Sequence, residues 1–356
     1  MIPFSRETVL ILFLTLFIAV GVVALPTAHQ WTLQQSGVTA RLRGLSAVND
    51  RVVWASGAGS TVLRTVDGGA TWQKLTVTTD DLDFRDIDAV DEQTAYVLSI
   101  GNGATSRIYK TTDAGATWIE QFRNTESKGF LDAMSFWDAT HGIAMGDSID
   151  RQFYILTTSD GGKSWLRVPA NVLPKALDNE GAFAASGTNI ALYGKSDAWI
   201  ATGGGAKSRI LRTSDRGRTW KVSETPIVAG ASAGVFSIAF RDANHGVIVG
   251  GDYKKEDTGA DNLALTEDGG ITWQLHKGLS GYRSGVAYVP GGWGDKPSLI
   301  AVGPTGSDYS GDDGLSWRLN GPGFDTVSFD PLPKNARRIG WAAGKDGNLG
   351  RLIIDQ

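Results

Sequence analysis

Short apolar runs of five to eight residues recur along the chain from residue 31 onward, separated by turns rich in Gly, Asp and Ser. Runs of this length, bounded by turn residues, are typical of buried β-strands. A repeated sequence phrase that ends in Trp allows the runs to be aligned. Three runs precede most copies of this phrase and one run follows each copy. Around the first copy the runs are 42–48, 52–57, 61–65 and 72–77. Four short strands per repeat predict the blade of a β-propeller, and therefore an all-β fold.

The repeated phrase reads TVDGGATW at residues 65–72 and recurs at 111–118, 158–165, 213–220, 266–273 and 310–317. It lies between the third and fourth runs, where a hairpin turn is expected. There, an Asp accepts hydrogen bonds from backbone N–H groups, Gly permits a positive φ, and a Thr or Ser hydroxyl bonds further loop groups. We expect each Trp ring to fill the space between blades. The predicted structural residues are Asp67, Trp72, Asp113, Trp118, Asp160, Trp165, Asp215, Trp220, Asp268, Trp273, Asp312 and Trp317.

Successive phrase Trp residues are 46, 47, 55, 53 and 44 positions apart, which suits propeller blades with variable loops. After the last copy, residues 325–355 contain three more apolar runs and no phrase. The stretch WTLQQ (31–35) resembles the residues that follow a phrase Trp, so it predicts the missing fourth strand. Sharing that blade between both chain ends closes the ring and leaves no free sheet edge. We predict one domain of seven blades over 31–356, with six blades as the alternative.

The N-terminal segment differs from the rest, because residues 9–25 form an uninterrupted apolar run of 17 residues behind Arg6. A basic start, an apolar stretch and small residues at the cleavage site are typical of a signal peptide. The run also reaches the short limit for a membrane span. Residues 1–28 are therefore predicted to be a signal peptide or an uncleaved N-terminal membrane anchor. Either alternative exports the propeller, to the periplasm or the outside, and leaves this segment as its only membrane contact.

Composition removes several function classes. A net charge of −4 argues against a nucleic-acid partner, which requires a concentrated positive surface. The chain has no Cys, so disulfides, thiolate metal sites and a Cys nucleophile are excluded. The four His residues are scattered, and the Gly-rich stretch 203–207 precedes a strand rather than a helix. We therefore predict no metal, no cofactor and no catalytic residues. The loops 169–181 and 252–261 are expected to be insertions on blades.

The phrase S/T-x-D-x-G-x-T/S-W resembles the Asp-box, also called the bacterial neuraminidase repeat (BNR). Over nearly all of the chain after its N-terminal segment, the sequence resembles the bacterial branch of the photosystem II stability/assembly factor family, the Ycf48-like and HCF136-like propellers. The resemblance rests on residues 43–72, 83–103, 236–253 and 281–288. It implies a non-catalytic assembly chaperone, although many relatives occur in bacteria without a photosystem. The role therefore carries over as a class: an exported propeller that binds a protein partner.

The innermost strand of each propeller blade lines the central channel, so its first residues are expected at one mouth of that channel. These positions carry arginines, carboxylates and a tyrosine: Arg43, Arg85, Asp86, Asp132, Glu180, Tyr282, Arg283 and Asp325. Converging polar groups on an apolar scaffold are typical of binding sites. They predict a site for a ligand or for a protein partner in the cell envelope. The alternative is structural, with arginines and carboxylates neutralising one another.

A glycan-binding or sialidase-like glycoside hydrolase propeller is the second functional hypothesis. Sialidases share the Asp-box, bind a carboxylate with three arginines and use a Tyr as nucleophile. Their F/Y-R-I-P motif is absent here, and the nearest stretch, DFRDI at 83–87, lacks the Pro. Tryptophans outside the phrase could serve as glycan platforms, namely Trp54, Trp137, Trp199, Trp293 and Trp341. We favour a monomeric, non-enzymatic protein-binding propeller.

Overall fold

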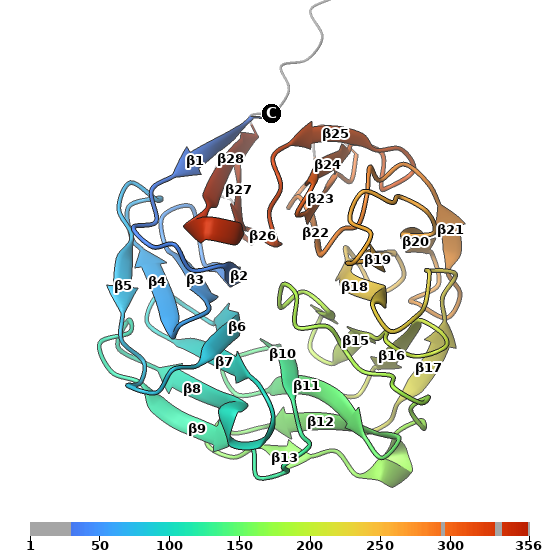
Figure 1. Cartoon of the computed structure of the whole chain (residues 1–356), viewed down its shortest axis with the longest axis horizontal. Helices are drawn as coiled ribbons and strands as arrows, with labels where there is room; N and C mark the ends of the chain where they lie inside the picture. The colour runs from blue at the N-terminus through green and yellow to red at the C-terminus, as the bar shows by residue number, and fades with distance from the viewer. Residues whose placement is uncertain (1–29, 293–295, 332–336, 355–356) are drawn as a thin grey trace, which may run out of the picture.

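The computed structural model describes residues 30–292, 296–331 and 337–354. Within these ranges the chain forms seven four-stranded antiparallel sheets around a central axis (Figure 1). This confirms the predicted all-β, seven-bladed propeller, and the six-bladed alternative is wrong. Blades 1 to 6 begin at β2 (Leu42–Ala47), β6 (Asp83–Ala89), β10 (Leu131–Phe136), β14 (Ile190–Tyr193), β18 (Ala233–Phe240) and β22 (Gly285–Tyr288), and blade 7 combines the first described strand with the last three. The predicted signal peptide or anchor lies outside the described residues, and none of the described helices is long and apolar enough to cross a membrane.

The strands occupy equivalent positions in each blade. The innermost strands are β2 (Leu42–Ala47), β6 (Asp83–Ala89), β10 (Leu131–Phe136), β14 (Ile190–Tyr193), β18 (Ala233–Phe240), β22 (Gly285–Tyr288) and β26 (Thr326–Phe329). The second strands are β3 (Val53–Gly57), β7 (Ala95–Ile100), β11 (Gly142–Ile149), β15 (Asp197–Ala201), β19 (Gly246–Asp252), β23 (Leu299–Gly303) and β27 (Arg338–Ala343). The third strands are β4 (Thr61–Thr65), β8 (Arg107–Thr111), β12 (Gln152–Thr158), β16 (Arg209–Thr213), β20 (Leu263–Thr266), β24 (Gly306–Ser310) and β28 (Leu349–Ile354). The outermost strands are β5 (Gln73–Leu75), β9 (Ile119–Arg123), β13 (Leu166–Arg167), β17 (Lys221–Glu224), β21 (Gln274–His276), β25 (Arg318–Gly321) and β1 (Trp31–Gln34). Three short 3-10 helices lie in loops, η1 (Gly103–Thr105), η2 (Ala170–Val172) and η3 (Lys345–Gly347).

Blade 7 closes the ring as the sequence predicts. Strand β1 pairs antiparallel with β28, with Trp31 opposite Leu352, so the first described strand is the outermost strand of the last sheet. The Trp31 ring packs at 5.1 Å from the ring of Phe324 in the same blade. The innermost strands contact one another all the way round, including β2 with β26. Blade 7 therefore closes the ring by joining the first described strand to the last three.

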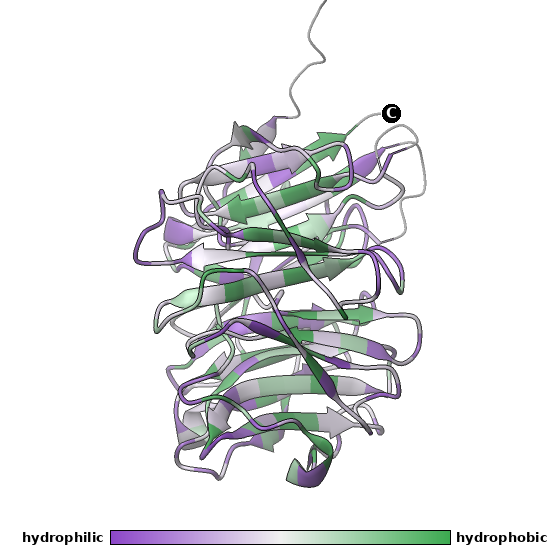
Figure 2. Ribbon diagram, turned by 90° about the vertical axis from the view of Figure 1, so that its right-hand side faces the viewer, coloured by the Kyte–Doolittle hydropathy of each residue, from purple (hydrophilic) through white to green (hydrophobic). Residues whose placement is uncertain are grey.

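The hydrophobic core is divided into layers between neighbouring blades. Residues of blade 1, such as Leu42 and Leu63, share one cluster with Trp341 and Leu349 of blade 7, and the other neighbouring pairs follow the same plan. Apolar segments accordingly run through the middle of the strands, with polar residues in the loops (Figure 2). Each sheet thus buries both of its faces, which leaves the strand ends around the axis to carry polar side chains.

The six phrase turns share one hydrogen-bond pattern. In the first, Thr65 Oγ1 donates to Asp67 Oδ1 at 2.8 Å and accepts from the Gly69 N–H at 2.9 Å, while the Thr71 N–H donates to Asp67 Oδ1 at 3.0 Å. The other five repeat it. Hydrogen bonds from Thr71 lower the pKa of Asp67 to about 2. The Trp72 ring meets Trp341 of blade 7 edge-on at 6.0 Å. The phrase therefore folds a turn and packs its Trp between blades.

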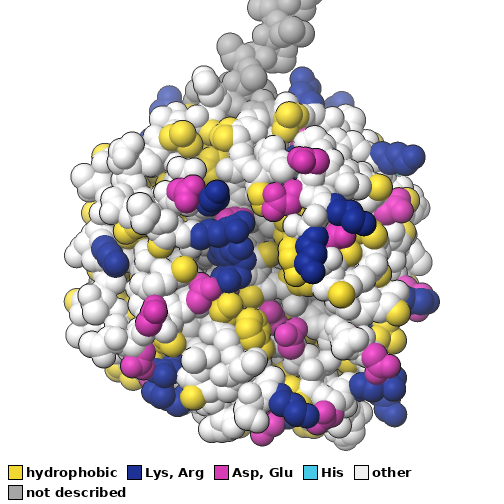
Figure 3. Space-filling view, viewed as in Figure 1, with side chains coloured by type: hydrophobic (Ala, Val, Ile, Leu, Met, Phe, Trp, Pro, Cys, Tyr) yellow, Lys and Arg dark blue, Asp and Glu magenta, His cyan; other side chains and the backbone are white. Residues whose placement is uncertain are grey.

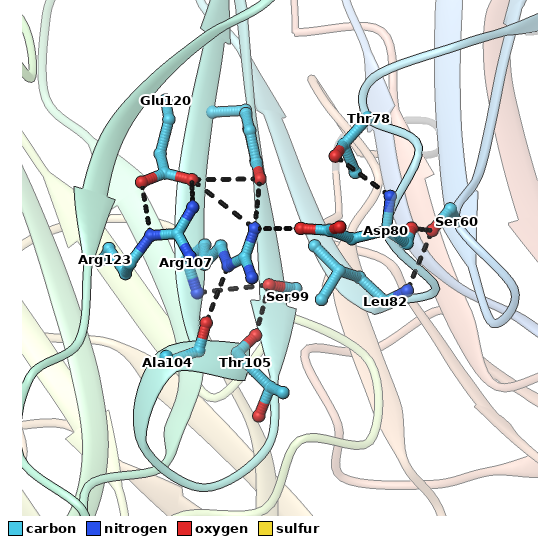
Figure 4. A network of polar contacts seen from close by, with 11 residues as sticks. Ser60, Thr78, Asp80, Leu82, Ser99, Ala104, Thr105, Arg107, Glu120 and Arg123 are labelled. Atoms are coloured by element: carbon cyan, nitrogen blue, oxygen red, sulfur yellow. Dashed lines mark hydrogen bonds and ion pairs between the residues drawn. The ribbon is translucent and has the colours of Figure 1, made fainter.

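Charged side chains also join blades outside the channel. Arg107 of β8 pairs through Nη1 with Asp80, which lies in the connection between blades 1 and 2, at 2.6 Å (Figure 4). The same nitrogen contacts the Tyr109 hydroxyl at 3.0 Å, and that hydroxyl donates to Glu120 of β9 at 3.1 Å. Arg123 completes the network by pairing with Glu120 at 2.7 Å. Every charge in this network has a partner, as expected of a structural contact.

Candidate functional site

A β-bulge interrupts the innermost strand of blades 1, 2, 3 and 5. In blade 1 the register between β2 and β3 skips one residue between Leu42 and Gly44, and β6, β10 and β18 show the same shift. The residues at the four shifts are Arg43, Arg85, Asp132 and Phe236. A bulge re-aims the side chain of its extra residue. All four side chains line one cavity at a mouth of the channel.

This cavity, which we call the axial pocket, has a volume of about 700 Å³. Its larger lining side chains include three notable groups. They are the arginines Arg41, Arg43 and Arg85, the carboxylates Asp132, Asp147, Glu256 and Asp325, and the aromatic residues Phe130, Phe183, Phe236, Tyr253 and Tyr282. Figure 3 shows Lys and Arg side chains gathered beside the central hollow, over the region of β2 and β6. The pocket is large enough for several residues of a peptide.

Arg43 and Arg85 converge on one backbone carbonyl. Nη1 of Arg85 donates to the Ala184 oxygen at 2.9 Å, and Nη1 of Arg43 reaches it at 3.4 Å. Arg85 also pairs with Asp83 at 2.8 Å. Arg43, in contrast, makes no ion pair with a carboxylate of the described chain, and its buried Nε has no acceptor there. Burial, followed by the charge of Arg85, lowers the pKa of Arg43 to about 10. Arg43 therefore stays charged at neutral pH with unused donors.

Arg41 is the third arginine of the axial pocket, and the sequence analysis did not include it. Its Nε and Nη2 donate to the two carboxylate oxygens of Asp325 at 2.7 and 2.6 Å. This bidentate bond raises the pKa of Arg41. Asp325, a predicted site residue, thus lines the pocket with its charge already matched. Arg41 precedes Arg43 by two residues, and this spacing was the available signal.

The segment 182–188, which we call the axial segment, passes through the channel. Its Ala184 carbonyl accepts from blades 1 and 2, Ser186 Oγ donates to the Ser284 carbonyl of blade 6 at 2.7 Å, and Thr326 of blade 7 donates to the Ser186 carbonyl at 2.9 Å. Residues 182–185 line the axial pocket, whereas 186–188 line a second cavity at the opposite mouth. The insertion expected at 169–181 therefore leads into a segment that separates the two cavities.

An aromatic wall forms another side of the pocket. The Phe183 ring of the axial segment stacks on Phe236 at 4.0 Å with an interplanar angle of 6°. Tyr253 meets both rings edge-on, at 6.3 and 6.1 Å, and is 42% exposed. Tyr282, a predicted site residue, packs against Phe236 at 4.7 Å, and burial raises its pKa. This wall offers apolar surface beside the arginines.

Two carboxylates form the acidic side of the pocket. Asp132, a predicted site residue, is 2% exposed, and Asp147 follows strand residue Gly146, which pairs with Leu131. Burial raises the pKa of Asp132 well above its usual value, with the Asp147 charge adding to the effect, and burial raises the pKa of Asp147 to about 6. Asp147 was not identified from the sequence.

Three predicted site residues lie outside the axial pocket. Arg283 is fully buried and pairs through Nε with Asp308 at 2.6 Å. Glu180 is buried against Arg209 of β16, to which it is paired by two hydrogen bonds, and it also accepts from the Leu177 N–H at 2.7 Å. Asp86 accepts from the Met134 N–H at 2.7 Å and lines the cavity at the opposite mouth. Their predicted placement at one common mouth is therefore wrong.

The physical reason is register. In blade 6 Ser284 donates its N–H to Val302, as Asp325 of blade 7 does to Ala343, so Ser284 and not Arg283 occupies the position that faces the channel. One residue of shift turns a strand side chain to the other face. Arg283 therefore points between blades, and Asp86, one residue beyond the bulge at Arg85, points along the channel away from the pocket. Glu180 instead anchors the loop that leads to the axial segment.

The proposed glycan platforms are mostly core residues. Trp54, Trp199 and Trp341 are buried, and Trp137 donates Nε1 to the Asp197 carbonyl at 2.8 Å. Trp293 lies outside the described residues. The predicted arginines Arg43, Arg85 and Arg283 do not meet in one cavity, because Arg283 is buried against Asp308. Arg41 takes the third place in the axial pocket, but its Nε and Nη2 donors already bind Asp325.

No family model matches the chain, and no curated protein does. Solved structures match over most of its length. A YCF48 bound to a D1 peptide has a TM-score of 0.63 at 18% identity, covering 91% of this chain and 97% of that one. YCF48 from Cyanidioschyzon merolae gives 0.63 at 16%, covering 91% and 98%. An ancestral GH74 enzyme gives 0.62 at 14%, covering 91% of this chain and 46% of that one. At these identities the likeness establishes the fold, a Ycf48-like seven-bladed propeller.

Proposed function

We propose that this Ycf48-like propeller is a non-enzymatic assembly or stability factor that binds an acidic peptide segment of a protein partner in its axial pocket. The observation that carries the proposal is Arg43, a charged side chain at the pocket with no carboxylate partner in the described chain. Arg43 is half-buried, and an unpaired guanidinium that is partly removed from water costs stability, which favours a ligand that supplies the missing anion.

The recognised group is a carboxylate, supplied by a chain terminus or by an Asp or Glu side chain. The guanidinium groups of Arg85 and Arg43 both donate to the Ala184 carbonyl. They therefore lie close enough together for one ligand carboxylate to bind both. Arginine donors in a fork bind carboxylates through two parallel hydrogen bonds. The aromatic wall then gives surface for apolar side chains of the same peptide. The YCF48 neighbour bound to a D1 peptide supports peptide binding as a use of this fold.

Peptide libraries test this proposal. The full-length protein is titrated with hexapeptides that carry a free C-terminal carboxylate, with the same peptides amidated, and with a set that lacks Asp and Glu. We expect binding to need a terminal or side-chain carboxylate and to weaken at least ~10-fold when Arg43 and Arg85 are both changed to Ala, since a hydrogen bond to a charged group contributes about 1.5–3 kcal/mol.

Arg123→Ala is the matched control. Arg123 lies on the outermost strand β9, is paired with Glu120 and is half exposed, so its loss should leave peptide affinity unchanged. Unchanged affinity in the Arg43→Ala/Arg85→Ala protein, or equal binding of amidated peptides without Asp and Glu, would contradict the proposal.

We further propose that residues 1–28 deliver the propeller outside the cytoplasm, where its partner is a cell-envelope protein. The support is the apolar run at 9–25 behind Arg6. Fusing residues 1–30 to alkaline phosphatase, which is active only outside the cytoplasm, should give an active reporter. Replacing Leu12 and Phe13 by Arg should abolish that activity, and an active reporter after this change would contradict export.

A further inference from the structure

Asp132 presents a buried carboxylate oxygen that no group of the described chain satisfies. The residue is 2% exposed and lines the axial pocket, and its Oδ2 has no hydrogen-bond partner. No Lys, Arg or His of the described residues lies within ion-pairing distance of it. Arg85 is the positive charge that attracts it, but its guanidinium is already bonded to Asp83 and to the Ala184 carbonyl.

Asp147 adds a second carboxylate to the same side of the pocket. It follows Gly146, whose strand partner Leu131 precedes Asp132, and its N–H donates to the Phe130 carbonyl at 2.9 Å. Gly181 lies against it, because a Cβ on Gly181 would be 1.9 Å from Asp147 Oδ1. Burial raises the pKa of each carboxyl group, and the charge of Asp147 raises that of Asp132 further. Such a pair is expensive unless a cation joins it.

The donor set favours an organic cation over a metal ion. Among the described residues, no group of three or more His, Asp or Glu side chains could hold a metal. A guanidinium has five N–H donors in a plane and can bond two carboxylates at once, while an ammonium has three donors. The aromatic wall of Phe183, Phe236 and Tyr253 lines the same pocket and can pack against the methylene stem of such a side chain.

We propose that Asp132 and Asp147 form a cation subsite that accepts the Arg or Lys side chain of a peptide held in the axial pocket. The inference rests on the proposed function, which identifies the ligand as a peptide. The subsite adds a second chemical group that this peptide must carry. The peptide carries a carboxylate for Arg43 and Arg85 and a cationic side chain for Asp132 and Asp147. Uncharged analogues of the same shape leave Asp132 unsatisfied and are rejected.

Calorimetric titration with arginine amide tests the subsite without any carboxylate in the ligand. Citrulline amide, which has nearly the same shape and the same α-amino group but an uncharged side chain, is the matched ligand control. We expect arginine amide to bind the full-length protein at least ~10-fold more tightly than citrulline amide. Asp132→Asn and Asp147→Asn should each remove that preference. If one of the two variants fails to fold, the other still tests the subsite. Lysine amide and spermidine complete the series. Comparing their affinities with that of arginine amide shows whether the subsite prefers a peptide side chain or a free polyamine.

The Arg43→Ala/Arg85→Ala protein separates this inference from the proposed function. It should bind arginine amide as tightly as the parent, or more tightly because two repelling charges are gone, while losing acidic peptides. If acidic peptides bind and arginine amide does not, the subsite is wrong and the proposed function stands. If arginine amide binds through Asp132 and acidic peptides do not, the subsite stands and the proposed function fails. Equal binding of citrulline amide, unchanged binding by both Asn variants, or tighter binding of spermidine than of arginine amide would overturn the assignment.

Discussion

Two sets of charged side chains, one buried between blades and one at the axial pocket, have opposite designs. Between blades 5 and 6, Arg283 and Asp308 are both fully buried and joined at 2.6 Å, with further hydrogen bonds from Arg283 to neighbouring oxygens. In the axial pocket, Arg43 and Asp132 each retain a polar atom without a partner in the described chain. A matched buried pair serves the fold, whereas unmatched buried charges cost stability and indicate binding. Arginines and aspartates thus play different roles in the two places, because a shift of one residue in strand register decides whether a side chain points between blades or into the pocket.

The largest expected effect is on the matched pair. Asp308→Ala leaves the Arg283 guanidinium buried without its anion, so it should lower the free energy of unfolding by about 3–5 kcal/mol. Denaturant unfolding measures this change. Peptide affinity measured below the unfolding transition should stay that of the parent. A stability loss under about 1 kcal/mol would contradict the structural role of the pair.

Asp147→Asn should have the opposite sign at neutral pH. Folding raises the pKa of this carboxyl group to about 6, from about 4 in the unfolded chain. Below pH ~4 both states hold the proton, and between pH ~4 and ~6 only the folded state does, so stability falls as pH rises through this window. Asp132 and Asp88, whose pKa values are also raised by burial, keep part of that fall, so the variant should reduce it and be about 1–3 kcal/mol more stable at pH 7. Unfolding curves at pH 4 and pH 7 compare the two proteins, and an equal pH dependence in both would contradict the assignment.

Arg43→Ala is the smallest expected change in stability. Because Arg43 has no ion pair and lies beside Arg85, its removal should leave the free energy of unfolding unchanged or raise it by up to about 1 kcal/mol. Thermal unfolding of Arg43→Ala, Asp308→Ala and the parent protein under the same conditions compares the stability of the three. A loss of several kcal/mol would place Arg43 with the structural charges.

The fold was predictable because every blade repeats the same packing requirement. The phrase folds the same turn six times, and the stretch 31–35 supplies the strand that the last sheet lacks. Local chemistry and periodicity carry that information, so they gave the blade count correctly.

The site was predictable only where the repeat kept its register. Arg43, Arg85 and Asp132 share one bulge position, so alignment of the innermost strands found them. The same alignment points to Phe236 and Ser284, and taking Arg283 instead was an error of one residue. The axial segment, and with it the role of Glu180, depends on contacts with blades far away in sequence. No local pattern predicts such a path.

The guanidinium signals of Arg43 test the central claim most directly. In NMR spectra of the side-chain nitrogens, titration with an acidic peptide selected from the library should shift the Arg43 resonances until they saturate. The affinity derived from these shifts should equal the affinity measured in the peptide titrations. The resonances of Arg283 should not move. Saturable binding that leaves Arg43 unchanged, or that shifts Arg283 equally, would contradict recognition of an anion in the axial pocket.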